Sequence, residues 1–248
     1  MSVSPIHPDQ EMLTAVSQAY SSFNRDASVW IEDFTRQGGT IHCGSGCFHC
    51  CNFPIRVSLA EALLTASFLS SEQLEAMNFH ALKVLENARS ASSWDEYFAR
   101  HRQEVGFCPL LDRSTGACGA YEARPGRCRD TFSALSADYC KVGTLEHLNR
   151  SERLAYKKAV KTNPATDGLS HYVAPLEDLG VSIWEVASRQ MRQSWDLEVW
   201  GDFWVLTTLS RDVAFMLAIR AGQVKSAVKR AKILGLWHLK IVQIATRR

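Results

Sequence analysis

The sequence lacks any long apolar run and any stretch that would mark a secretory leader. No uncharged apolar segment approaches the ~20 residues of a membrane-spanning helix. Residues 1–10 contain two prolines and no apolar run, which argues against a signal peptide. We therefore expect a soluble, cytoplasmic protein without a membrane partner. In that reducing compartment, clustered cysteines are more often metal ligands than disulfides.

The motifs of several enzyme and nucleotide-binding classes are also missing. The chain has no phosphate loop, no glycine-rich dinucleotide loop, no Ser–His–Asp order and no His-Glu-x-x-His motif. It shows no internal repeat and no alternating strand–helix pattern. Its 248 residues, of which 46% are hydrophobic, suffice for a sizeable core without disulfides. These patterns assign no catalytic residue.

Acidic residues are absent from residues 221–248, a segment that holds seven Lys or Arg. Because the whole chain carries a net charge of +2, residues 1–220 carry −5. Lys225, Lys229 and Lys232 fall on one face of a predicted helix, and such a basic face is most often simply solvated. We therefore expect no nucleic-acid partner, which leaves a protein or peptide as the candidate partner.

Cysteine is what the sequence has in unusual density. Four of its eight cysteines form the pattern Cys43-x3-Cys47-x2-Cys50-Cys51, and the other four follow at nearly even intervals. Several thiolates at such short spacing can surround one metal ion or cluster. Glycines between them let the backbone turn tightly and aim N–H groups at metal-bound sulfur. The predicted metal ligands are Cys43, Cys47, Cys50, Cys51, Cys108, Cys118, Cys128 and Cys140.

Three interpretations of these cysteines stay open. A structural zinc site needs only four thiolates, and the adjacent Cys50 and Cys51 fit poorly on one tetrahedral ion. An iron–sulfur cluster, alone or beside a zinc ion, uses the full set more naturally. A disulfide framework is the least favoured because no leader sequence is evident. We expect an iron–sulfur cluster or iron as the cofactor, with zinc as the alternative or second metal.

Helical periodicity surrounds the cysteines. Apolar spacing predicts helices over about 8–36, 59–70, 94–105, 176–195, 197–220 and 223–246. A capping box of Ser58 and Glu61 begins the helix at 59, and Ser70 with Gln73 begins another. Residues 106–130 contain too many glycines and prolines for a long helix, so turns and short extended pieces are expected there.

The fold class that follows is mainly α. We expect a helical scaffold around an irregular cysteine-rich metal-binding centre, with a C-terminal helical region. Asn163-Pro164 and Asp167-Gly168 are typical of a linker. The sequence therefore predicts a cysteine-cluster domain with its N-terminal helix over residues 1–163, and a helical region over residues 164–248 that packs on it.

The cysteine motifs and their neighbours, over about residues 42–140, resemble the YkgJ-like cysteine cluster proteins, a family of zinc- or iron-chelating domains. The matching segments are the cysteine pattern itself, Val57-Ser58-Leu59-Ala60-Glu61-Ala62, Cys108-Pro109-Leu110-Leu111, Cys118-x-x-Tyr121-x-x-Arg124-Pro125, Cys128-Arg129 and Cys140. The resemblance implies metal binding. The family is loosely labelled as iron–sulfur oxidoreductases, and some relatives with a similar cluster are flagellin lysine N-methylases.

The spacing of Cys43, Cys47 and Cys50 also equals that of the radical S-adenosylmethionine motif, in which three thiolates hold a four-iron cluster. His49 replaces the aromatic residue usual before the third cysteine of that motif. The usual fold for that chemistry is a βα barrel, and the strand–helix alternation of such a barrel is absent here. Because the cysteine spacing matches and the barrel pattern does not, a radical or methyl-transfer enzyme acting on a protein or peptide is an alternative rather than the main prediction.

Arg124, Arg127 and Arg129 surround Cys128. Guanidinium groups could stabilise the negative charge of a thiolate cluster or receive an anionic substrate. We predict Arg124 and Arg129 as cofactor-binding residues; the alternative is a rigid Arg124-Pro125 turn with its side chain bonded to backbone carbonyls. Asp130 could fix an arginine beside the site, the favoured role, or act as an acid–base group.

Other side chains complete the predicted site. His42 and His49 flank the cysteines as candidate ligands or supporting residues. A pocket is expected between the cysteine core and the 197–220 helix, with Trp200 and Trp204 as its lid.

The function predicted from these features is a metalloprotein whose clustered cysteines bind an iron–sulfur cluster, zinc or both, with redox or modification chemistry. Whether it is an enzyme, such as an iron–sulfur oxidoreductase, stays open at this point. The alternative of a different class is a zinc-stabilised, non-catalytic protein-interaction module in which the metal only holds the fold.

Overall fold

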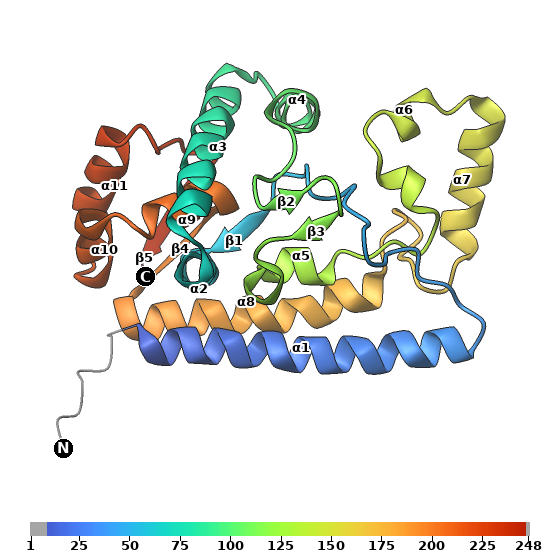
Figure 1. The fold of residues 1–248 in the computed structure, drawn as a ribbon, viewed down its shortest axis with the longest axis horizontal. Helices are drawn as coiled ribbons and strands as arrows, with labels where there is room; N and C mark the ends of the chain where they lie inside the picture. The colour runs from blue at the N-terminus through green and yellow to red at the C-terminus, as the bar shows by residue number, and fades with distance from the viewer. Residues whose placement is uncertain (1–8, 247–248) are drawn as a thin grey trace.

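Two long antiparallel helices form the base of the molecule (Figure 1), in a computed structural model that describes residues 9–246. α1 (Gln10–Arg36) and α8 (Ala174–Trp195) lie side by side. The buried residues of α1 recur at three- and four-residue steps: Met12, Val16, Tyr20, Phe23 and Ala27. The helix predicted over 8–36 is thus confirmed over 10–36, and residue 8 lies outside the described part of the chain.

Both predicted capping boxes are present. Ser58 and Glu61 begin α2 (Leu59–Phe68), and Ser70 and Gln73 begin α3 (Ser71–Ser90). The side chain of each serine accepts a backbone N–H in the first turn, and the N3 side chain accepts the N–H of that serine. These local bonds explain why both helices begin where the sequence predicts.

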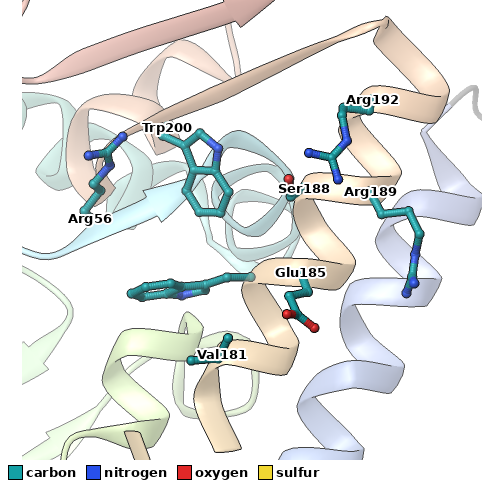
Figure 2. Close-up of a pocket in the computed structure, with 8 residues that line it drawn as sticks. Arg56, Val181, Glu185, Ser188, Arg189, Arg192 and Trp200 are labelled. Carbon is teal, nitrogen blue, oxygen red and sulfur yellow. The ribbon is translucent and has the colours of Figure 1, made fainter. Parts of the chain in front are cut away.

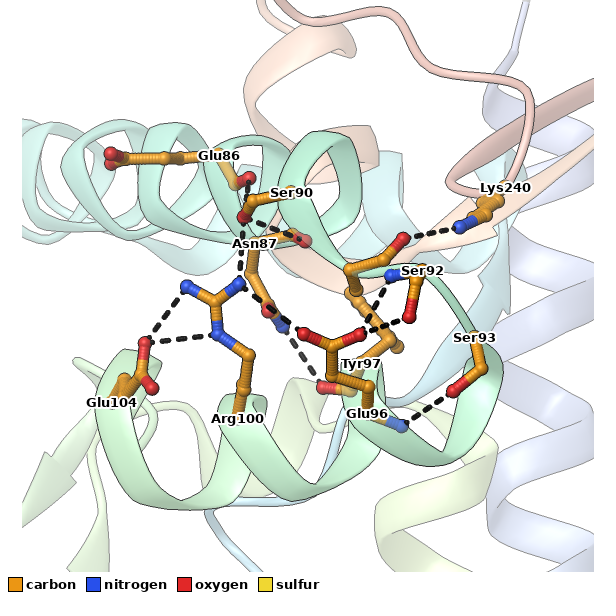
Figure 3. Close-up of polar contacts among 11 residues, drawn as sticks. Glu86, Asn87, Ser90, Ser92, Ser93, Glu96, Tyr97, Arg100, Glu104 and Lys240 are labelled. Atoms are coloured by element: carbon orange, nitrogen blue, oxygen red, sulfur yellow. Dashed lines mark hydrogen bonds and ion pairs between the residues drawn. The ribbon is translucent and has the colours of Figure 1, made fainter.

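Polar contacts fix the turn between α3 and α4 (Trp94–Arg100), as Figure 3 shows. The carboxylate of Glu96 accepts both the backbone N–H and the hydroxyl of Ser92, at 2.8 and 2.5 Å. Arg100 bonds Ser90 and Glu104, and Asn87 donates to the carbonyl of Tyr97. α4 therefore folds back against α3, and the π-helix η1 (His101–Val105) then leads the chain toward Cys108.

The middle of the chain is irregular, as predicted. Its regular elements are short: β2 (Leu111–Asp112), β3 (Ala117–Cys118), η2 (Tyr121–Ala123), α5 (Gly126–Asp130), η3 (Ala137–Cys140) and α6 (Thr144–His147). β2 and β3 pair as an antiparallel hairpin in which Leu111 lies opposite Cys118. α7 (Arg150–Thr162) follows and is largely exposed.

A three-stranded antiparallel sheet crosses the centre, in the order β1 (Arg56–Ser58), β4 (Leu197–Asp202), β5 (Val242–Thr246). The continuous helix predicted over 197–220 is therefore wrong. The chain instead forms β4, α9 (Phe203–Leu209) and α10 (Val213–Arg220). Leu197, Val199 and Gly201 are buried in strand-like alternation, and Asp202 then caps α9.

The helix predicted over 223–246 is also wrong in its second half. α11 (Val224–Ile233) is followed by Gly235, whose φ of +71° ends the helical path, and the chain returns as β5. The register places Val199 opposite Ile244. The apolar residues over 234–244 thus lie in a loop and in strand β5 rather than on one face of a helix.

The architecture is mainly α, as predicted, and it has one hydrophobic core. Residues of α1, α2, α3, α8 and α9 contribute to the same buried cluster. The sheet joins β1 to β4 and β5 across the predicted division at 163/164, so both sides share that core. The division into two domains stays a prediction. Across residues 9–246, no helix is both long enough and apolar enough to cross a membrane.

Candidate metal centre

The first four cysteines lie on a loop of successive tight turns. Backbone N–H groups of Cys47 and Cys51 donate to the carbonyls of Gly44 and Phe48, at 3.1 and 2.9 Å. The loop is joined to the next cysteine by the bond from the N–H of Cys108 to the carbonyl of Cys51, at 2.8 Å. The sequence-distant cysteines are thus brought beside the loop by backbone contacts.

The β2–β3 turn packs directly on this loop. A Cβ atom added to Gly116 would lie 2.4 Å from the carbonyl oxygen of Gly46, so only glycine fits there. Both glycines have positive φ, +73° and +83°. This close approach places Cys118, on β3, next to the loop of the first four cysteines.

These elements enclose a cavity of about 890 Å³, which we call the cysteine cavity. Seven of the eight cysteines line it: Cys43, Cys47, Cys50, Cys51, Cys108, Cys118 and Cys128. The eighth, Cys140, is buried near Cys43 and Cys50; its burial raises its pKa, and the charges of these two cysteines add to the rise. All eight thiols are free. The structure therefore brings the two cysteine groups of the sequence together.

Cys43, Cys47, Cys50 and Cys140 form one neighbourhood. Burial raises the pKa of Cys43 to about 11, with a further contribution from Cys47 and Cys50. Burial likewise raises the pKa of Cys140 to about 12. Two nitrogens face the sulfurs: the backbone N–H of Ser133 donates to Cys43 Sγ at 3.1 Å, and His171 Nε2, which can donate in one of its tautomers, lies 3.3 Å from Cys140 Sγ. Such donors stabilise metal-bound thiolate.

Cys108, Cys118 and Cys128 form a second neighbourhood. Burial raises the pKa of Cys128 well above its usual value, and the charges of Cys108, Cys50 and Cys118 add to this. Burial raises the pKa of Cys108 to about 11, although the indole N–H of Trp204 donates to its sulfur at 3.3 Å. Cys50 adjoins both neighbourhoods, and its pKa is raised by a hydrogen bond with Cys51 and by burial.

The donor chemistry of the cavity fits a soft metal. Burial, with a further contribution from the charge of neighbouring cysteines, raises the pKa values of Cys43, Cys108, Cys128 and Cys140, so these thiols are protonated at neutral pH and would release their protons to a soft metal. As the side chains are placed, no three His, Cys, Asp or Glu residues within 9–246 are arranged to hold a single ion. Binding a metal therefore requires the thiol side chains to move closer together.

The three arginines around Cys128 differ in position: two line the cysteine cavity and one does not. Arg124 lines the cavity with its guanidinium 4.1 Å from the ring of Tyr121, and its buried Nε has no partner within the described chain. Arg127 also lines it and pairs with Asp130 at 3.2 Å and Glu177 at 2.8 Å. Asp130 thus holds an arginine beside the site, as expected.

Arg129 has a different environment from the one predicted. It is 2% exposed and is not among the residues that line the cavity. Its guanidinium donates to the carbonyls of Arg124 and Glu122 and to Asn24 Oδ1, and it lies over the ring of Tyr20 at 4.2 Å. These contacts indicate that Arg129 holds the 122–129 turn, so of the two predicted arginines only Arg124 reaches the cavity.

Sequence reasoning missed two residues. His171 lies 31 positions from Cys140, so no local spacing could indicate their contact; its Nδ1 is 3.0 Å from the hydroxyl of Tyr156. Glu61 was recognised only as a cap, yet it also accepts the N–H of Gly126 at the start of α5. His42 and His49, by contrast, do not line the cavity.

The predicted lid is formed in part. Phe203 and Trp204, at the start of α9, line the cysteine cavity, whereas Trp200 lies on β4 and lines a separate pocket. The element that covers the cysteines is thus the N-terminal end of a short helix and not the long helix predicted.

One family comparison matches this region. Residues 42–158 match the model of the family described as "CxxCxxCC: Putative zinc- or iron-chelating domain", a range that contains all eight cysteines. No curated protein and no solved structure matches the chain. The match confirms the resemblance that the cysteine motifs indicate. Residues 42–158, a little under half of the chain, are thus similar to this family of zinc- or iron-chelating cysteine domains.

Proposed function

We propose that the eight cysteines bind an iron–sulfur cluster, with zinc or iron as a second centre beside it, and that redox or modification chemistry takes place in the cysteine cavity. The observation that carries this proposal is the convergence of seven cysteines on one cavity with the eighth directly beside them. One structural zinc ion would need only four. Cys50, which adjoins both neighbourhoods, would lie between the two centres.

The surroundings supply what a thiolate-bound metal needs. Ser133, Trp204 and His171 direct nitrogens at three of the sulfurs. Such contacts orient the ligands and tune the metal. Arg124 would balance the negative charge of the thiolates from the wall of the cavity.

The bound group would supply electrons or a Lewis acid, while the chain's own residues control access to it. Trp204 and Phe203 cover the cysteines from one side. Cys108 and Cys128 are partly buried at that end of the cavity, which limits their contact with water. The volume that remains lets a ligand approach the sulfurs, which is the property expected of a reactive rather than a closed site.

Anaerobic purification followed by metal and acid-labile sulfide analysis tests this function. The proposal expects a brown protein that contains iron and sulfide and absorbs near ~400 nm. A colourless protein with stoichiometric zinc and no iron would contradict it.

That second outcome would favour a zinc-stabilised, non-catalytic interaction module. The observation on its side is the short, irregular structure between β2 and α6, which a metal could hold together. A radical or methyl-transfer enzyme is less favoured as an alternative. The strands of the described chain pair antiparallel, in two small sheets, and do not form a βα barrel.

A further inference from the structure

A second pocket of about 680 Å³ lies between α8 and β4, and we call it the arginine–tryptophan pocket. Its chemistry comes from six of its lining residues: Arg56, Trp184, Glu185, Arg189, Arg192 and Trp200. Figure 2 shows Trp200 between Arg56 and Arg192, with Glu185 further along α8 beyond Ser188 and Arg189. The volume is in the range of sites for small organic ligands.

The pocket carries a net positive charge, because three arginines but only one carboxylate, that of Glu185, are among the residues that line it. Arg56 bonds the neutral side chain of Gln243 at 2.6 Å, and neither Arg56 nor Arg189 forms an ion pair within residues 9–246. Arg192 pairs with Glu198. A ligand group that contacts Arg56 should therefore be an anion. A guanidinium binds carboxylate or phosphate oxygens through two parallel hydrogen bonds of fixed geometry.

The aromatic walls are held in place. The rings of Trp184 and Trp200 meet at 6.3 Å with an angle of 70° between their planes. Glu198 fixes Trp200 by accepting its indole N–H at 2.9 Å while also holding Arg192. Rigid indole faces favour a planar ring, because stacking on them requires no rearrangement.

The two cavities meet at shared residues. Arg56 and Trp184 line both the arginine–tryptophan pocket and the cysteine cavity. A molecule seated against them from the first pocket would therefore extend toward the cysteines. The residues that would recognise an anion and a planar ring thus lie at the border of the cysteine cavity.

We propose that the arginine–tryptophan pocket binds a small anionic ligand that carries a planar ring, of the size of a nucleoside monophosphate, and presents it to the cysteine cavity. The inference rests on the proposed function only for the reaction of the ligand in the cysteine cavity. Binding itself depends on the arginines and tryptophans and not on which metal the cysteines hold.

Calorimetric titration of the full chain, as purified and with its metal content measured, tests this proposal. The probes are AMP and indole-3-acetate, which combine ring and anion, with adenosine and inorganic phosphate as the separate parts. The proposal expects AMP or indole-3-acetate to bind more tightly than either part, and expects this binding to weaken as salt is added. Failure of both combined probes to bind would overturn it.

Matched variants assign any binding to the pocket. Trp200→Leu should weaken binding about tenfold through lost stacking, and Arg56→Gln about tenfold through a lost charged hydrogen bond. Trp94→Leu and Arg211→Gln, which alter residues that line neither cavity, should leave it unchanged. If Arg56→Gln remains folded and binds as well as the unaltered chain, the pocket is not the site.

The metal analysis separates this inference from the proposed function. Iron and sulfide without ligand binding would leave the metal centre standing and overturn the ligand site. Binding that depends on Trp200, which lines the arginine–tryptophan pocket and not the cysteine cavity, in a protein without iron would support the ligand site and contradict the iron–sulfur function.

Discussion

Glu61 joins three parts of the chain through one buried carboxylate. It accepts the N–H and hydroxyl of Ser58 at 3.0 and 2.9 Å, the N–H of Gly126 at 2.9 Å and the hydroxyl of Tyr20 at 3.4 Å. Burial raises its pKa, and these hydrogen bonds oppose the rise. Because Gly126 begins the helix that carries Cys128, Glu61 positions a predicted metal ligand without touching the metal.

Glu61→Ala should lower the free energy of unfolding by about 3 kcal/mol, because several buried donors lose their acceptor. Denaturant melts of the metal-loaded protein would measure the change. Glu75→Ala, an exposed substitution on α3, is the control and should have little effect. Equal losses in the two variants would contradict the role given to Glu61.

Arg129→Lys should destabilise the fold by about 2 kcal/mol, since lysine cannot reproduce the planar set of bonds to two carbonyls and Asn24. The bound metal per folded chain should stay the same, because Arg129 does not line the cavity. Arg25→Lys, at an exposed position of α1, is the matched control. Normal stability with lost metal would show that Arg129 acts on the metal centre instead.

Among the elements, the β2–β3 hairpin and the first cysteine loop depend on contact at Gly116. Gly116→Ala should lower both stability and metal retention, because its Cβ would overlap the carbonyl of Gly46. Gly38→Ala is a close control: its φ of +89° gives similar backbone strain, but nothing lies within 4 Å of the added carbon. Metal content and thermal melts should be measured for both variants. Equal losses in the two would mean that backbone strain, and not the contact of Gly116 with Gly46, accounts for the effect.

The helix α9 begins at Asp202, whose carboxylate caps it by accepting the N–H groups of Trp204 and Val205. Burial raises the pKa of Asp202 from 3.8 to about 7. The folded state therefore retains a proton that the unfolded chain loses. Its stabilising contribution is complete below about pH 4 and is lost as the pH rises to about 7.

Asp202→Asn keeps a capping oxygen but cannot ionise. The free energy of unfolding of this variant, relative to the unaltered chain, should thus increase between about pH 4 and 7. Denaturant melts of both proteins across that range would measure the difference. A constant difference would mean that Asp202 is already ionised in the folded protein.

The elements also show what sequence can and cannot predict here. Capping boxes at Ser58 and Ser70 and the stripe of α1 are local signals, and the predicted helices are confirmed there. β4 and β5 were missed because their pairing joins residues far apart in the chain, and apolar spacing over short segments suits helix and strand alike. Cysteine spacing indicated the site, but the contact of His171 with Cys140 depends on tertiary structure alone.

Within the whole molecule, loss of metal should destabilise residues 42–140 more than the remaining helices. Cys47→Ser should reduce the thermal stability of residues 42–140 while leaving much of the helical circular dichroism intact, because α1 and α8 pack through their own apolar faces. Limited proteolysis would show where the chain opens. Unchanged thermal stability would contradict a structural contribution of the metal.

Both cysteine groups should bind metal in one cavity. Anomalous diffraction from crystals of the anaerobically purified protein, recorded at the iron and zinc edges, would locate the metal. We expect anomalous density among Cys43, Cys50 and Cys128, with sulfurs from both groups about 2.3 Å from metal. Density confined to one group, or located outside the cavity, would contradict it.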